Sequence, residues 1–538
     1  MPLLANILAL AATSVATSAA GGVPLRYRSM GGRFKHGGID AAQAMRAARA
    51  EAGSFPSPRF VTQRLDHFDG SNAATWEQAY YVNDTFWKAG SSAPVWLCVG
   101  GEGPPMDGSA VVNSVHCNVA VEWMAETGAL MFALEHRYYG CHNVSACPVA
   151  DLSKPGALRF HSSRQALGDI AAFVEYARDA YGLTAANKWV TWGGSYPGML
   201  AGWARLKFPH LIHASVSSSA PVRAELDMQG YNDVVAAAYA VSDQGVGGSP
   251  ACQAAIAQGH KQIGELFGSA AGRTRLASLF GQTAGWYAIK ENQVGFAGQG
   301  VADFPAQAND PACTDPMCDV RRICAAMVDT ATGDEVARLA HVRTAQLSAE
   351  ESGEPLMALS ARPSADSGAT IVSEKPAPGY DGGEQLWAWQ TCTEFGFYQT
   401  CEVGSKCFYT QGLATLEEEM AFCQEDFGLS KEVVAANIAY SNAYYGADHP
   451  EGSRVFYVNG EVDPWHANSI NAALSPELPA LYVPGASHHA WTHPSLLSDQ
   501  DSVVQARAAI RKQVEAFLQE GSTFGSQGSP AIATPVVI

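Results

Sequence analysis

Short apolar segments and amphipathic segments alternate in the first 220 residues of the chain and again after residue 450. Runs rich in Val, Leu, Trp, Tyr and Phe are typical of buried strands, and they predict strands at 76–81, 93–99, 129–134, 188–192, 214–217, 454–458 and 481–483. Apolar residues at helical spacing predict helices at 164–181, 199–208 and 502–518. Strands that alternate with helices predict an α/β fold, a mostly parallel sheet with helices on both faces.

The middle of the chain, residues 225–440, has a different pattern. Alternating strand-like runs disappear, and helix-like segments such as 417–427 and 432–445 dominate. The segment 349–385, rich in Ser, Gly, Pro and Glu, is predicted to be a surface loop. The region also holds eight of the twelve cysteines, at positions 252, 313, 318, 324, 392, 401, 407 and 423. We therefore interpret 225–440 as a helical, disulfide-rich cap inserted into the sheet domain.

The two ends of the chain differ in composition from the segments between them. Residues 1–20 are an apolar run that ends in small residues, which predicts a secretory signal peptide. Residues 21–58 lack periodicity and are interpreted as a loose arm or propeptide, and 521–538 as a disordered tail. The sheet domain then comprises 59–224 and 441–520. No other run of about 20 apolar residues occurs, so no membrane span is expected.

Size, charge and cysteine content narrow the class of protein. At 538 residues the chain exceeds what one hydrophobic core usually serves, which agrees with an inserted cap. A formal net charge of −18 argues against a nucleic-acid partner, because an acidic protein repels phosphates, and favours a small molecule or peptide. Twelve cysteines, none in Cys-x-x-Cys spacing, indicate an oxidising compartment and argue against zinc. No metal or cofactor is expected. Asn83 and Asn143 begin Asn-x-Ser/Thr triplets and are predicted N-glycosylation sites.

Ser195 is the candidate nucleophile. It follows Gly193 and Gly194 at the end of a predicted strand and precedes a predicted helix. This is the arrangement of a nucleophile elbow, in which a sharp turn holds a serine hydroxyl above the sheet. The N–H of Tyr196 is then one candidate donor of an oxyanion hole, and Gly101, in a glycine-rich loop after an early strand, supplies the other. An ordinary Gly-Gly-Ser turn is the alternative.

Asp463 and His488 complete a possible catalytic triad. Each follows a predicted strand, and the order serine, acid, histidine is that of α/β-hydrolases. Loops at the carboxyl ends of parallel strands lie at one edge of the sheet, so distant residues meet there. The histidine would remove the serine proton, and the carboxylate would fix the tautomer of the histidine and stabilise its charged form. An Asp-Pro turn and a surface pair formed by His488 and His489 are the alternatives.

Short motifs that run in the same order along nearly the whole chain carry a family resemblance. They are Gln63-x-Leu65-Asp66-His67-Phe68, Gly100-Gly101-Glu102-Gly103, Glu135-His136-Arg137-Tyr138-Tyr139-Gly140, Gly193-Gly194-Ser195-Tyr196, Trp389-Gln390-Thr391-Cys392-Thr393-Glu394-Phe395-Gly396, Asn459-Gly460 with Asp463-Pro464-Trp465, and Ser487-His488. With these motifs the chain resembles the S28-type prolyl serine peptidases. That family includes lysosomal Pro-Xaa carboxypeptidase, dipeptidyl peptidase II and thymus-specific serine protease, and the last of these branches is the most similar.

The resemblance implies an α/β-hydrolase fold with an inserted helical cap and Ser195, Asp463 and His488 as catalytic residues. For the carboxypeptidase and dipeptidyl peptidase branches it also implies cleavage of short peptides after proline, whereas the substrate of the thymus-specific branch is less defined. It further implies a lysosomal, endosomal, vacuolar or secreted location in the secretory pathway, and a possible homodimer. At one position the chain departs from the family pattern. The family commonly has Asp three residues after the active histidine, and here Trp491 stands in that place.

A cap over the active site favours an exopeptidase, because it leaves room for only a few residues of substrate. Recognition of a free amine needs a carboxylate, for which Glu102 and Glu394 are candidates. Recognition of a terminal carboxylate needs a cation or N–H donors, for which Arg137 is a candidate. Trp465 is a candidate wall of a proline pocket. Structural packing and hydrogen bonding are the alternatives for all four residues. The polarity of cleavage, that is, whether the enzyme acts from the amino or the carboxyl end of a peptide, stays open.

The leading hypothesis from the sequence is a serine exopeptidase that forms an acyl-enzyme on Ser195. Two alternatives are an esterase or lipase on the same fold, and a catalytically inactive homologue that binds peptides.

Overall fold

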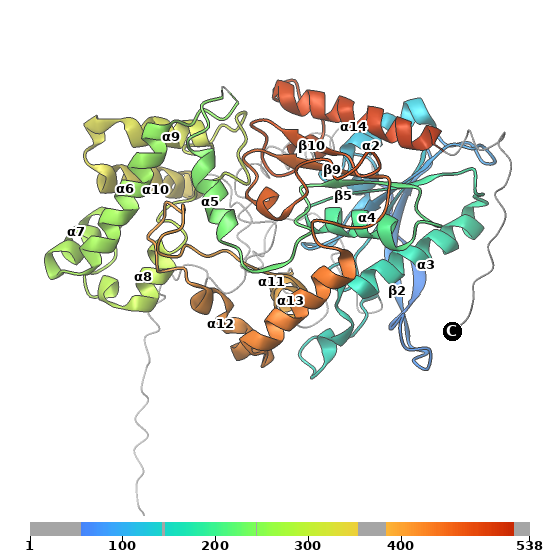
Figure 1. The fold of residues 1–538 in the computed structure, drawn as a ribbon, viewed down its shortest axis with the longest axis horizontal. Helices are drawn as coiled ribbons and strands as arrows, with labels where there is room; N and C mark the ends of the chain where they lie inside the picture. Colours follow the sequence, from blue (N-terminus) through green and yellow to red (C-terminus); the bar gives the residue numbers. More distant parts are fainter. Residues whose placement is uncertain (1–54, 142–145, 244, 353–382, 521–538) are drawn as a thin grey trace, which may run out of the picture.

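The computed structural model describes residues 55–141, 146–243, 245–352 and 383–520 (Figure 1). Its main sheet has eight strands: β1 (Arg59–Arg64), β2 (Thr75–Asn83), β3 (Val95–Val99), β4 (Leu130–Leu134), β5 (Trp189–Gly194), β6 (Ala214–Ser218), β9 (Val455–Gly460) and β10 (Ala480–Val483). Their order is β1-β2-β4-β3-β5-β6-β9-β10, and β2 runs antiparallel to both of its neighbours while the other pairs are parallel. This is the α/β-hydrolase fold, as the sequence predicts.

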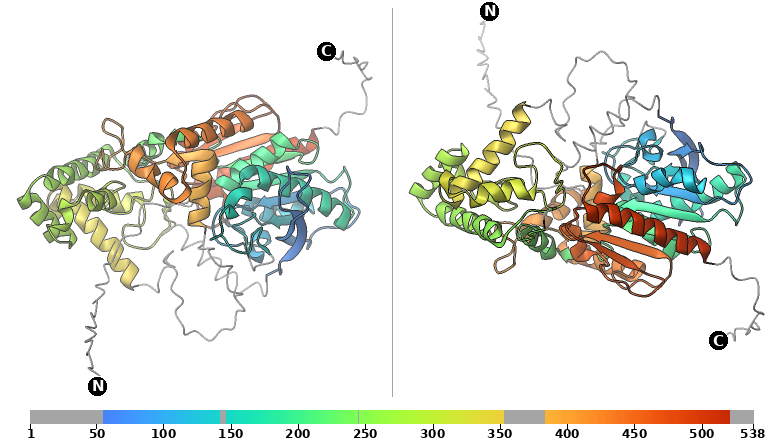
Figure 2. Two further views of the ribbon diagram at one scale, coloured as in Figure 1. Left: turned by 90° about the horizontal axis from the view of Figure 1, so that it is seen from below. Right: turned by 90° about the horizontal axis from the view of Figure 1, so that it is seen from above.

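Helices cover both faces of this sheet, and alternate residues of each strand point to opposite faces. In β3, Leu97 packs with α3 (Ser163–Tyr181) and α4 (Tyr196–Lys207). Its neighbour Trp96 points to the opposite face, which is covered by α2 (Asn118–Thr127) and α14 (Asp501–Gln519), as Figures 1 and 2 show. A parallel sheet buried on both faces needs apolar residues at nearly every position, which explains the continuous apolar runs of its strands.

Capping residues set the ends of these helices. The Ser162 hydroxyl accepts a hydrogen bond from Gln165 N at the start of α3, and Gly182 ends that helix in the left-handed region at φ 62°. Helix α4 begins at Tyr196, earlier than the predicted start at residue 199, because Ser195 takes the N-cap place and Pro197 fits the first turn. The nucleophile candidate therefore lies directly at the N-terminus of a helix.

The region between β6 and β9 is mainly helical. Its helices are α5 (Gln229–Ala238), α6 (Pro250–Phe267), α7 (Ala270–Phe280), α8 (Lys290–Ala297), α9 (Val320–Val328), α10 (Glu335–Ser352), α11 (Glu384–Gln390), α12 (Leu416–Phe427) and α13 (Lys431–Tyr445). A π-helical turn, Thr391–Phe395, follows α11. The expectation that strands disappear here is wrong in one detail. Glu225–Asp227 (β7) and Gly396–Tyr398 (β8) form a parallel pair, and strands this short leave no period to detect.

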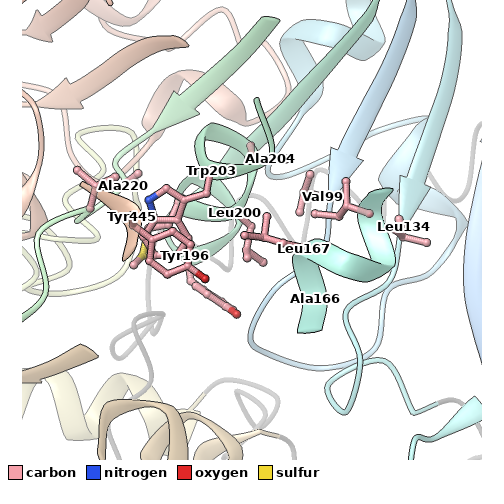
Figure 3. Close-up of a cluster of buried hydrophobic side chains, with 14 of the residues drawn as sticks. Val99, Leu134, Ala166, Leu167, Tyr196, Leu200, Trp203, Ala204, Ala220 and Tyr445 are labelled. Carbon is pink, nitrogen blue, oxygen red and sulfur yellow. The ribbon is translucent and has the colours of Figure 1, made fainter. Parts of the chain in front are cut away.

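The helical region divides into two packing units. Helices α5 to α10, together with the segment 401–414, enclose a second hydrophobic core, and these helices extend away from the sheet in Figure 1. Helices α11 to α13 instead pack on the sheet domain, where the Tyr445 ring stacks on Trp203 of α4 with centroids 3.6 Å apart. Figure 3 shows this pair beside Tyr196 and Leu200. The sequence-based boundaries at 224 and 440 stay an interpretation.

Six disulfides link all twelve cysteines: Cys98–Cys117, Cys141–Cys147, Cys252–Cys324, Cys313–Cys318, Cys392–Cys423 and Cys401–Cys407. Four of them lie within the helical region, and none joins it to the sheet domain.

Several predicted segments lie outside the described residues: the signal peptide, all but the last residues of the arm, most of the loop 349–385, and the tail. None of the described helices is long and apolar enough to cross a bilayer.

Candidate active site

Ser195 lies in the sharp turn between β5 and α4. Its backbone is in a strained region for a non-glycine residue, at φ 67° and ψ −134°, and its side chain is almost fully buried. The neighbouring glycines are required by close packing. A methyl group on Gly193 would overlap the backbone of Pro197, and one on Gly198 would overlap the Ser218 carbonyl oxygen. The turn therefore has the geometry of a nucleophile elbow.

Asp463 and His488 lie beyond the carboxyl ends of β9 and β10 and are joined by a hydrogen bond. The distance from His488 Nδ1 to Asp463 Oδ1 is 2.9 Å, and both side chains are buried. An ionised carboxylate accepts this bond, so the proton lies on Nδ1 and Nε2 is left as a base. His488 Nε2 and Ser195 Oγ have no hydrogen-bond partner among the residues that the structure describes.

The loop that carries His488 lies directly over the turn that carries Ser195. Ser195 N donates to the Ser218 carbonyl, and His489 N donates to the hydroxyl of the adjacent Ser219, at 2.9 and 2.8 Å. A methyl group added to Gly194 would touch the His489 ring. The structure thus brings the three predicted catalytic residues to one edge of the sheet, in an environment that is buried rather than at the surface.

The glycine-rich loop after β3 packs on the first turn of α4. A methyl group on Gly101 would overlap the Pro197 ring, so only glycine allows this approach. The loop follows a strand that is next to β5 in the sheet. This places the backbone of Gly101 close to the start of α4, where Tyr196 follows the nucleophile. The assignment of their N–H groups as oxyanion donors stays a prediction.

Glu102 follows Gly101 and lies beside the nucleophile. The residue as a whole is half-buried, but its Oε2 atom is buried and has no hydrogen-bond partner within the described part of the chain. Burial raises the pKa of Glu102 to about 8, and the shift is opposed by its own backbone N–H and by the Ser195 hydroxyl, which lies near the carboxyl group without meeting the geometry of a hydrogen bond. Glu102 thus has an unsatisfied carboxyl oxygen beside the candidate nucleophile.

Arg137, by contrast, is not available to a substrate. It is fully buried, and its Nε and Nη2 donate to the two carboxylate oxygens of Asp169 at 2.7 Å each. The remaining donors go to the carbonyl oxygens of Arg64, Leu65 and Phe160. The suggestion that Arg137 binds a substrate carboxylate is therefore wrong, because this guanidinium links the end of β4 to α3 and to the segment after β1.

Glu394 is also used inside the protein. Its carboxylate accepts hydrogen bonds from the backbone and hydroxyl of Ser163 at 3.0 and 2.6 Å, and from Gln390 Nε2 at 3.0 Å. Burial raises the pKa of Glu394, and these donors oppose the shift. Gln390 Nε2 also donates to the Tyr196 hydroxyl at 2.9 Å, and that hydroxyl lies 3.0 Å from His136 Nε2. Glu394 thus anchors a network behind the start of α4 and is not free to bind an amine.

Trp465 does lie near the predicted catalytic residues. Its backbone N donates to Asp463 Oδ1 at 3.0 Å, and its ring centroid is 6.5 Å from that of His488. Its indole N–H donates to Gln307 Oε1, and the Gln307 carbonyl accepts from His488 N at 3.1 Å. Gln307 comes from the helical region and holds both loops, a role that sequence reasoning missed because the surrounding segment has no periodicity.

A group of histidines lies behind His488. The rings of His116 and His489 are 5.2 Å apart, and those of His489 and His493 are 5.5 Å apart. Burial lowers the pKa of His116 to about 4 and that of His493 to about 3, so these rings are neutral near pH 7.

Trp491, at the position that departs from the family pattern, is fully buried and donates its indole N–H to the Ser218 hydroxyl at 3.0 Å. It acts as a packing residue.

Asn83 is the one predicted glycosylation site within the described residues. It ends β2 and is half-buried, and its Nδ2 donates to the Val111 carbonyl at 2.9 Å. Asn143 lies outside the described residues. Glycosylation at both positions stays a prediction.

In the described part of the chain, no group of three or more His, Cys, Asp or Glu side chains could hold a metal ion.

The sheet topology and the nucleophile elbow define an α/β-hydrolase with the residue set of a serine enzyme. Residues 63–510 match the family model described as "Serine carboxypeptidase S28", and the chain therefore belongs to this family of serine peptidases. It is 35% identical to human thymus-specific serine protease over 87% of this chain and 88% of the relative, and 34% identical to the mouse protein over 87% and 89%. It is 24% identical to bovine lysosomal Pro-X carboxypeptidase over 86% and 88%. The chain is a serine-type peptidase.

Proposed function

We propose that the chain is a serine exopeptidase that cleaves short peptides after proline through an acyl-enzyme on Ser195. His488 Nε2 takes the Ser195 proton as Oγ bonds to the substrate carbonyl carbon, and then gives it to the leaving amine. A water molecule, activated by the same nitrogen, releases the acyl group. Asp463 holds the imidazole in the required tautomer and stabilises its charged form.

The hydrogen bond of 2.9 Å between His488 and Asp463, next to a strained and unpartnered Ser195, carries this proposal. A serine hydroxyl is a weak nucleophile, and a buried imidazole with a carboxylate on its far nitrogen is the usual means of activating it. Membership of a serine peptidase family supports peptides as the substrates.

Two observations support a preference for proline. Trp465 lies beside the catalytic histidine, and its ring is 5.5 Å from Phe397 and 5.2 Å from Tyr231. Aromatic faces pack well on the compact, apolar ring of proline. In addition, one of the relatives is named a lysosomal Pro-X carboxypeptidase. Arg137, the cation suggested for a substrate carboxylate, is paired with Asp169. Whether the amino or the carboxyl end of the substrate is recognised is therefore left to the experiment.

The test is mass spectrometry of the products from a matched set of short Xaa-Pro-Xaa peptides with free or blocked termini, at about pH 5 and pH 7. Cleavage after proline by the wild-type protein, abolished by Ser195→Ala, is the expected result. Ser278→Ala is a matched control, because Ser278 is an exposed serine on α7. Full activity of Ser195→Ala would contradict the proposal. Loss of a dipeptide only from free amino termini, or of one residue only from free carboxyl termini, would define the polarity.

We further propose that the protein works in the lumen of the secretory pathway or of lysosomes, or outside the cell. Six disulfides are typical of proteins that fold in an oxidising compartment, and the lysosomal relatives agree with this location. The homodimer stays a prediction.

A further inference from the structure

We propose that the side chain of Glu102 acts as a neutral carboxylic acid that donates a hydrogen bond to the oxyanion formed when Ser195 attacks the substrate. It would be a third donor beside the N–H groups of Gly101 and Tyr196. The inference rests on the proposed function and deepens it, because it assigns a catalytic role to a residue outside the triad.

The position of Glu102 is the first argument. It follows the candidate oxyanion residue Gly101 in a loop that packs against the first turn of α4. Its carboxyl group is close enough to the Ser195 hydroxyl to interact with it, and both groups lack a full hydrogen-bond partner among the described residues. A buried polar atom without a partner costs free energy, and such atoms at active sites are commonly satisfied only when the substrate is bound. When Ser195 attacks a substrate carbonyl, the oxyanion forms next to Ser195, so it is the group that could satisfy the nearby carboxyl group of Glu102.

The protonation state is the second argument. The groups shown to interact with Glu102 are the Ser195 hydroxyl and Tyr139, which comes from the loop after β4. Tyr139 is itself buried, and burial followed by the proximity of Glu102 and Glu394 raises its pKa well above the ordinary value. In the described part of the chain, no cation contributes to the pKa of Glu102, which burial raises to about 8. The acid therefore keeps its proton at neutral and acidic pH.

A neutral acid suits an oxyanion better than it suits a substrate amine. An ammonium group needs a carboxylate partner, and ionising this buried group below pH 8 costs free energy. A protonated carboxyl group, in contrast, donates a short and strong hydrogen bond to a negative oxygen. In the reaction the Ser195 proton moves to His488 and the carbonyl π electrons move to the oxygen. Glu102 keeps its own proton throughout, and its hydrogen bond is released when the carbonyl re-forms.

The test compares Glu102→Gln, Glu102→Ala and wild type with one peptide that the wild type cleaves, between pH 5 and pH 9, with kcat and KM measured separately. Gln keeps a donor N–H but does not ionise. We expect Glu102→Ala to lose about 10²-fold in kcat with little change in KM. We expect Glu102→Gln to stay within about tenfold of wild type and to lose the fall in kcat that wild type shows above pH 8, where a carboxylate would repel the oxyanion. Glu451→Gln, an exposed residue, is the matched control.

Two results would overturn the inference. One is a Glu102→Gln variant that is as inactive as Glu102→Ala, because this would show that a donor N–H cannot replace the carboxyl group and that catalysis needs a carboxylate at this position. The other is a loss confined to KM, or to peptides with a free terminus, which would make Glu102 a reader of that terminus. Labelling of Ser195 by a fluorophosphonate separates the failures. If wild type is not labelled, the proposed function fails, whereas labelled variants with unchanged kcat overturn only the role of Glu102. Thermal midpoints at pH 5 verify that both variants fold.

Discussion

Arg137 and Asp169 form a fully buried, bidentate ion pair, with both N–H···O distances at 2.7 Å. The pair joins the motif at the end of β4 to the middle of α3, and His67 adds a third bond to the same carboxylate at 2.7 Å. Burial alone would raise the pKa of Asp169, but Arg137 and His67 outweigh it, and the pKa lies below its ordinary value. The motif that suggested substrate binding is therefore a structural junction.

Replacement of one partner should leave the other charge buried and uncompensated. We expect Arg137→Met to lower the free energy of unfolding by about 3–5 kcal/mol, measured by urea denaturation at pH 7. Whatever activity remains should keep the wild-type preference for free or blocked peptide termini. A stable variant with an altered terminal preference would return Arg137 to the substrate site.

Gly101 offers a sharp test of the loop beside the nucleophile. An added methyl group would overlap the Pro197 ring, so Gly101→Ala must move the loop or the start of α4. Oxyanion geometry is sensitive to such shifts, and we expect kcat to fall by at least about 10². Gly295→Ala is the control, because Gly295 lies in α8 with open space around its Cα. Equal kcat values for the two variants would show that the loop takes no part in catalysis.

Much of this site was predictable because its local signals are strong. Gly-Gly-Ser after a continuous apolar strand marks Ser195, and Asp463 and His488 each follow another apolar strand. Parallel topology then brings the three together without further information. The same alternation of strands and helices predicts a mostly parallel sheet, and the structure agrees with it.

The roles of the surrounding charged residues were not predictable, because they depend on contacts between distant segments. Arg137 pairs with a residue of α3, and Glu394 binds Ser163 from 231 positions away in the chain. Glu102 is distinguished from them only by what it lacks in the described structure, a partner for Oε2. A motif shows which residue types are present, whereas the availability of a side chain depends on its neighbours in space.

The disulfide between Cys252 and Cys324 joins α6 to α9 across 72 residues. Both cysteines belong to the core of helices α5 to α10, which is separate from the sheet. Closing a loop of this length restricts the unfolded chain, and its loss is expected to cost about 4 kcal/mol. We expect a Cys252→Ser, Cys324→Ser double variant to unfold its helical region at lower urea concentration, which hydrogen exchange would locate in α6 and α9. Loss of protection in the strands instead would contradict the separate core.

His493 should make the protein less stable as the pH falls. Burial first, and then His116, Arg507 and His488, lower the pKa of His493 from its ordinary value of 6.5 to about 3. The unfolded chain therefore binds a proton below about pH 6.5 that the folded chain does not bind until about pH 3, so stability decreases as the pH falls through this range.

Replacement of His493 by Asn removes this proton uptake. Between pH 8 and pH 5 we expect His493→Asn to lose about 1–2 kcal/mol less free energy of unfolding than wild type. His449→Asn is the control, because the His449 side chain is 82% exposed in the folded protein, so unfolding changes its surroundings little. The measurement is urea denaturation of the three proteins at both values of pH. If His493→Asn and wild type lose the same free energy, the imidazole takes up its proton in the folded protein, and the histidine group behind His488 is charged rather than neutral at acidic pH.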